Sequence, residues 1–295
     1  MVGAWIQIVE CGSILKPKIA LEDCWTRLTR AKEHQIVLNA ACEAIIASEG
    51  YTFDLDCDSS GFGAIKFVDR ADSQLVLRAA TYFGEIVSNL WAARNYVIWN
   101  LASLREQSEQ PIGWKRLGFP VLGQEPLPTE SFAGLMRNTK LAGLGKIDID
   151  KIEAMQPYLN GMRDGVTGLR QADKSNPHYV LEELAILDRH RRLALLPLHP
   201  IDFNPSVEIV SGVGTVKSVS VDRSVIGHPL SHGDVVANFR IQQVTQCTIL
   251  ANPRARVQIF PADVIPNDGT TFADWIDSLV TCVAEVIRAF EPDFQ

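Results

Sequence analysis

The sequence is poor in the short motifs that usually reveal catalysis. None of its six cysteines forms a C-x-x-C pair, although a zinc site needs paired ligands at short spacing. The patterns at Gly61 and Gly212 are bare G-x-G, outside any strand–glycine–helix unit that binds dinucleotides. No serine lies in a G-x-S-x-G nucleophile context. The sequence therefore predicts no metal and no cofactor.

One cluster of metal-ligating residue types is nevertheless present. His228, His232 and Asp234 come close together in the sequence. As metal ligands they would have to converge rigidly, with further residues orienting them. Pro229 and Gly233 instead predict a turn that leads into a strand.

The chain also lacks a long apolar run and an excess of basic residues. No stretch approaches the roughly 20 uninterrupted apolar residues that span a bilayer, and residues 1–10 lack the basic start of a signal peptide. We therefore expect a cytoplasmic protein without membrane contact. The net charge of −7 argues against wholesale nucleic-acid binding, because phosphate affinity needs clustered Lys and Arg. A small local basic site stays open.

Apolar residues are plentiful. They make up 46% of the 295 residues, which is enough to bury a sizeable core. Cys24, Cys42 and Cys282 fall at apolar positions of predicted helices. We expect them to be buried free thiols, as in a reducing compartment.

Helical periodicity dominates the first two thirds of the chain. Apolar residues recur at three- and four-residue steps from Ala20 to Ser48 and again from Val76 to Leu101. Between them, two apolar runs flank Asp58–Gly63, which has the residues of a hairpin turn. This arrangement predicts an antiparallel pair of long helices. Shorter helices are predicted near residues 131–137, 148–155 and 177–187.

Near Leu193 the pattern changes to the alternation that is typical of strands. The clearest strand is Val235–Ile241, with apolar residues at every second position. Further strands are predicted at residues 193–197, 207–210, 216–221 and 256–260. Thr271 and Asp274 then approximate a capping box at the start of an amphipathic terminal helix.

Together these patterns predict an α+β fold. Residues 1–192 are expected to form a mainly helical domain that includes the long helix pair and the small hairpin. Residues 193–295 are expected to form an antiparallel sheet packed by the terminal helix. We expect the two parts to pack as one compact unit. The long apolar stripes permit a homodimer without requiring one.

The sequence Asp188-Arg189-His190-Arg191-Arg192 places a charged cluster at a predicted helix end. An imidazole oriented by a carboxylate, beside guanidinium groups that hold a phosphate, would suit catalysis. The structural alternative is that the cations complement the helix dipole while Asp188 pairs with one of them. His190, Asp188 and Arg191 are therefore the catalytic candidates, and Arg189 is a binding candidate.

Arg94 and Asn95 interrupt the apolar pattern of the second long helix. If their side of the helix faces another helix, both must be hydrogen-bonded. If it faces solvent, they need no further explanation. Together with Asn89 and Trp99 they form a set of binding candidates.

Short segments spread along the chain carry a family resemblance. They are Ser88–Leu101, Gly118–Val121, Ile152–Tyr158, Ile186–Arg191 and the turn Gly233-Asp234. In this order they resemble a widespread, functionally uncharacterised bacterial protein family with H-N-L-R-S-A-L-D-H, F-P-I, Q-P-Y and N-x-D-K-H-R motifs. The resemblance spans most of the chain and makes Gln156 and Tyr158 binding candidates.

The chain departs from this family in the first motif. The family's Arg, Asp and His fall on Trp91, Asn95 and Tyr96. An R-x4-H helix is reminiscent of HEPN-type RNases, in which Arg and His act in RNA cleavage without a metal. Because this chain has neither residue there, a nuclease of that kind would be inactive or would use another constellation around His190.

Three functions are compatible with these patterns. The first is a non-enzymatic scaffold or binding protein for a protein or RNA partner, linked to a mobile element or a defence system. The second is a HEPN-like nuclease or its inactive relative. The third is small-ligand binding between the helical and β parts, with Trp91, Trp99 and Tyr158 lining the site.

Overall fold

The computed structural model describes residues 20–47, 51–69, 72–190, 198–203, 205–226, 228–252, 255–259 and 271–295. Its helices are α1 (Glu22–Ala47), α2 (Ser73–Glu106), α3 (Phe132–Met136), α4 (Lys146–Glu153), α5 (Pro177–His190) and α6 (Phe272–Phe290). Its strands are β1 (Tyr51–Cys57), β2 (Phe62–Asp69), β3 (Leu198–Phe203), β4 (Ser206–Val221), β5 (Val235–Asn252) and β6 (Ala255–Ile259). The α+β class that the sequence predicts is confirmed.

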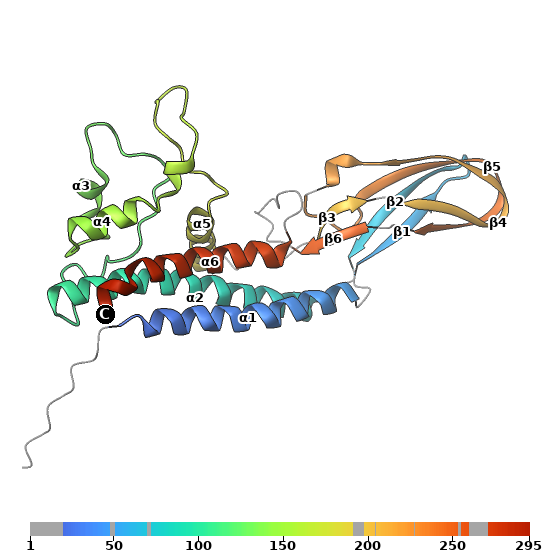
Figure 1. Cartoon of the computed structure of the whole chain (residues 1–295). Coiled ribbons are helices and arrows are strands. Elements are labelled where there is room, and N and C mark those ends of the chain that lie inside the picture. The colour runs from blue at the N-terminus through green and yellow to red at the C-terminus, as the bar shows by residue number, and fades with distance from the viewer. Residues whose placement is uncertain are drawn as a thin grey trace, which may run out of the picture.

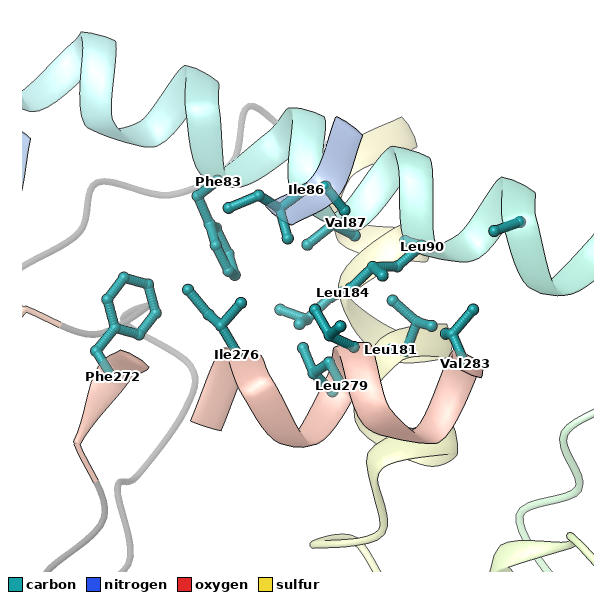
Figure 2. Packing of buried hydrophobic residues seen from close by; sticks show 14 of the residues in the cluster. Phe83, Ile86, Val87, Leu90, Leu181, Leu184, Phe272, Ile276, Leu279 and Val283 are labelled. Atoms are coloured by element: carbon teal, nitrogen blue, oxygen red, sulfur yellow. The ribbon is translucent and has the colours of Figure 1, made fainter. Parts of the chain in front are cut away.

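Helices α1 and α2 form the predicted antiparallel pair, and α6 lies along both of them (Figure 1). The apolar stripe of α2 faces that of α6, and Leu181 and Leu184 of α5 complete the layer (Figure 2). Ile276 and Leu279 of α6 are fully buried in this cluster. Burial of each such side chain contributes roughly 1.5–3 kcal/mol, so packing between the helices stabilises them.

The ends of α2 and α6 follow from their sequences. Asp72 caps α2 by accepting a hydrogen bond from the Gln74 N–H at 2.8 Å. At α6, the Thr271 hydroxyl accepts from the Asp274 N–H at 3.1 Å, and the Asp274 carboxylate accepts from the Thr271 N–H at 3.3 Å. The capping box predicted at this position is confirmed.

The main sheet is antiparallel, with strand order β1-β2-β5-β4. The predicted hairpin turn is confirmed: Asp58 accepts from the Ser60 and Phe62 N–H groups at 2.8 and 3.0 Å. Gly63 pairs with Phe239, whose ring occupies the space that a Cβ at position 63 would need. Glycine is therefore required at this point of the register.

Several strands differ in extent from the prediction. The two strands predicted at 207–210 and 216–221 are one strand, β4, because its pairing with β5 continues through a series of register shifts. The predicted strand at 256–260 is β6, which pairs with β3 in a separate two-stranded sheet. The strand predicted at 193–197 lies outside the described residues.

Strands and helices from the two sides of the predicted domain boundary pack against each other. The hairpin β1–β2 precedes the predicted boundary at residues 192 and 193, yet β2 pairs with β5, which follows it. Helix α6 likewise packs on α1 and α2. The boundary itself stays a prediction.

Charged residues join the end of the chain to the helical layer. Arg105 on α2 donates two hydrogen bonds to Asp148 at 3.1 and 2.7 Å and one to Asp293 at 2.7 Å. Lys151 on α4 contacts Asp293 at 2.9 Å, and Trp25 on α1 donates to Glu291 at 2.9 Å. These contacts hold three helices and the C-terminal residues together.

Among the described residues, no helix combines the length and the apolar character that crossing a membrane requires.

Candidate functional site

The guanidinium group of Arg94 lies fully buried between α2, α5 and the segment before α3. Its Nη2 forms an ion pair with the Glu182 carboxylate, and its Nη1 donates to the His178 carbonyl at 3.1 Å. The Trp91 indole also donates to Glu182, at 3.1 Å. Lys140 approaches the second carboxylate oxygen at 3.7 Å. A cation in the core is thus matched by one carboxylate with three partners.

Burial dominates the electrostatics of this pair. It lowers the pKa of Arg94, and the neighbouring Glu182 opposes the shift. An arginine still stays protonated, because its ordinary pKa is far above neutral. The charge therefore persists in the core, where losing its partner would leave it uncompensated. The Arg94 Nε has no hydrogen-bond partner among the described residues.

A histidine and a cysteine extend the buried network. The His178 Nδ1 lies 3.0 Å from the Cys282 Sγ, and the imidazole stacks on Phe119 with ring centroids 5.1 Å apart. Burial, together with the charge of Arg94, lowers the pKa of His178 to about 3. Burial raises the pKa of Cys282 to about 12, against the opposing influence of Arg94. At neutral pH the two groups are a neutral imidazole and a neutral thiol.

Asn95 and Gln156 hold the segment Gly118–Leu122 against the helices. The Asn95 side-chain oxygen accepts from the Phe119 N–H at 2.7 Å. The Gln156 side chain accepts from the Leu122 N–H at 3.1 Å and donates to the Pro120 carbonyl at 2.9 Å. Three of the predicted motif segments thus meet in space: one on α2, one at residues 118–121 and one that runs from α4 to Tyr158.

The remaining binding candidates make separate local contacts. Asn89 donates to the Glu85 carbonyl at 2.8 Å within its own helix. Trp99 meets Trp114 edge to face, with ring centroids 5.8 Å apart. The Tyr158 hydroxyl bonds to Glu153 at 3.2 Å, and its pKa is raised by burial and by that carboxylate.

The proposed ligand-lining residues also differ in their partners. Trp91 contacts Glu182, Trp99 contacts Trp114, and Tyr158 contacts Glu153.

The charged cluster is described only in part. Helix α5 ends at His190, and Asp188 is half-buried on its last turn. The side chains of Arg189 and His190, and the whole of Arg191, lie outside the described residues. The catalytic prediction for His190, Asp188 and Arg191 therefore stays a prediction.

Sequence reasoning missed Glu182 and His178, whereas its prediction of Cys282 as a buried free thiol is confirmed. A signal was present, because His178 and Glu182 lie four residues apart on one face of a predicted helix. Nothing in the sequence showed that this face meets Arg94, which lies 88 positions away from Glu182. Among the described residues, no group of three or more His, Cys, Asp or Glu side chains is placed to hold a metal ion.

The turn near His228 is as predicted. Gly233 has a φ of +92° and leads directly into β5 at Val235. Asp234 accepts from the Ser231 N–H at 2.7 Å, which closes the turn.

Comparisons of the chain with known protein families, with curated proteins and with solved structures find no match.

Proposed function

We propose that this chain is a non-enzymatic binding or scaffold protein, a member of the motif-defined bacterial family described above, that acts in the cytoplasm. One observation carries the proposal. The polar residues that interrupt the apolar pattern of α2 make contacts within the protein: Arg94 is fully buried against Glu182, and Asn95 accepts a hydrogen bond from the Phe119 backbone. These contacts hold the helical body together, and the Arg94 side chain is closed to solvent.

The chemistry of the buried Cys–His pair supports the same proposal. A nucleophilic cysteine needs a thiolate, which a neighbouring imidazolium stabilises. Here the order of pKa values is reversed, with Cys282 raised to about 12 and His178 lowered to about 3. The pair is suited to packing and hydrogen bonding rather than to attack on a substrate.

Two further observations support the location and the family. Cys24 and Cys282 are buried free thiols, the state that a reducing compartment maintains. The meeting of the 88–101, 118–121 and 152–158 segments gives the motif residues a shared structural role, around Asn95 and Gln156. A link to a mobile element or a defence system stays part of the proposal.

A HEPN-like nuclease built on His190 is the competing function. The test is incubation of labelled single-stranded RNA with the wild-type protein and with the His190→Ala variant. We expect the RNA to be degraded no faster with either protein than in buffer alone. Cleavage by the wild-type protein that His190→Ala abolishes would overturn the binding function. Arg189→Gln and Arg191→Gln would then show whether the neighbouring cations hold the phosphate.

A further inference from the structure

Two aromatic residues of α2 and one of the loop that follows it lie close together. Tyr96 is 39% exposed and Trp114 is 41% exposed. Trp99, half-buried, joins them, since it meets Trp114 edge to face and lies three residues from Tyr96 on the helix. Ile112, in the loop that carries Trp114, is 73% exposed. We call Tyr96, Trp99, Ile112 and Trp114 the aromatic surface.

A cation flanks each end of the aromatic surface. The Arg27 guanidinium of α1 lies 4.5 Å from the Tyr96 ring centroid and donates to its hydroxyl at 3.0 Å. The Lys115 ammonium lies 5.4 Å from the Trp114 ring centroid. Each cation is held by the ring beside it. The surface therefore combines aromatic rings with two neighbouring cations, while one carboxylate, that of Glu106, is bonded to the loop backbone.

The loop that carries Ile112 and Trp114 is held in place before any partner binds. The Ile112 N–H donates to Glu106 at 2.7 Å, at the end of α2. The Trp114 N–H bonds to the Pro111 carbonyl at 3.0 Å, and Gly113 adopts a φ of +72° within the turn. A preformed loop loses little conformational freedom on binding, which favours affinity.

We propose that the aromatic surface is a docking site for a linear segment of a protein partner that carries apolar residues flanked by acidic ones. Trp, Tyr and Arg are the residues that dominate binding energy in protein interfaces. Exposed apolar side chains that lie together mark interaction sites. Arg27 and Lys115 match carboxylates on either side of the apolar anchors. The inference rests on the proposed binding function and specifies the partner's chemistry.

Single-stranded RNA fits the same surface less well. Base stacking needs open ring faces, whereas Arg27 and Lys115 each cover one face of a ring. An extended polyanion also needs clustered cations along its length, whereas this surface offers Arg27 beside Tyr96 and Lys115 beside Trp114. The exposed aliphatic Ile112 suits an apolar side chain better than a phosphate backbone.

The test measures binding of defined probes by fluorescence anisotropy. The probes are labelled peptides with a central Leu-Phe pair between glutamates, the same peptides with Ser-Ser at the centre or with lysine flanks, and a labelled oligouridine. We expect the acidic Leu-Phe peptide to bind best and to bind less tightly as salt rises. Trp114→Ala should weaken it by about tenfold or more. The Arg27→Gln/Lys115→Gln double variant should weaken it and reduce its salt dependence.

Val166→Ser is the matched control, since Val166 is 95% exposed and lies in another loop. It should bind the peptide like the wild-type protein, and circular dichroism should show all variants folded. Equal binding of the Leu-Phe and Ser-Ser peptides, or unchanged binding by Trp114→Ala, would overturn the docking site. So would oligouridine binding that Trp114→Ala abolishes, or a wild-type dimer that Trp114→Ala dissociates in sedimentation. RNA cleavage dependent on His190 would overturn the underlying binding function separately.

Discussion

The Glu182 carboxylate on α5 pairs with the fully buried guanidinium of Arg94 on α2, and the two residues join helices that are distant in the sequence. The pair is asymmetric, because the Glu182 side chain keeps 16% exposure while that of Arg94 has none. Removing the Glu182 carboxylate therefore leaves the Arg94 charge without a counter-charge and without access to water. This asymmetry decides how the two positions should respond to substitution.

We expect Glu182→Gln to lower the free energy of unfolding by about 3–5 kcal/mol, because it leaves a buried cation without a counter-charge. Lys140→Gln is the control. Lys140 approaches the same carboxylate at 3.7 Å but is 42% exposed, so its loss should cost less than about 1 kcal/mol. Urea unfolding of both variants provides the measurement. Similar small losses in both would show that the Arg94–Glu182 pair does not stabilise the helical body.

The pH dependence of stability should report on His178. Its pKa in the folded protein is about 3, below the 6.5 of an ordinary histidine, because burial opposes its protonation. The unfolded chain therefore takes up the proton first. The stability that the neutral His178 contributes to the folded protein is fully present above about pH 6.5, and it is lost as pH falls toward about 3.

Comparison with His178→Phe isolates this contribution from the carboxylates that titrate in the same range. Between about pH 7 and pH 5, the wild-type protein should lose about 2 kcal/mol more stability than the variant. Denaturant unfolding at the two pH values gives the difference directly. Equal losses in the two proteins would mean that His178 titrates normally in the folded state.

Two glycines of one loop should respond in opposite ways to alanine. A Cβ at Gly161 would lie 1.5 Å from the Gln171 carbonyl oxygen, which is backbone and cannot turn aside, whereas a Cβ at Gly165 would meet nothing within 4 Å. We expect Gly161→Ala to destabilise the protein by about 1–3 kcal/mol or more. Gly165→Ala should be neutral or slightly stabilising. Thermal unfolding of the two variants side by side tests this, and equal midpoints would contradict the packing around Gly161.

Cys282 should resist alkylation in the native protein. Burial raises its pKa from the ordinary 9.0 to about 12, so its thiolate fraction is on the order of a thousandfold below that of a normal thiol. Mass-spectrometric mapping after iodoacetamide treatment should show that Cys282 is alkylated much more slowly than the half-buried Cys57 of β1. The difference should vanish in denaturant. Comparable rates in the native state would show that the Cys282 environment opens readily.

Local patterns in the sequence predicted most of the secondary structure. The caps at Asp72 and Thr271 and the Asp58 turn are decided by side chains within four residues of the backbone groups they bond. Periodicity likewise marked the buried face of α2. What it missed was pairing between strands, as in β4, because the partner strand determines where a strand ends.

The sequence by itself determined that Arg94 and Asn95 interrupt an apolar helix and that, if they were buried, both had to be hydrogen-bonded. Only the tertiary structure decided their partners, because Glu182 and the Phe119 backbone are distant along the chain and no local pattern encodes such a meeting. The same holds for the aromatic surface, where Arg27, Trp99 and Trp114 come from three separate segments. Helix packing brings these residues together, because each helix must bury its apolar stripe against another.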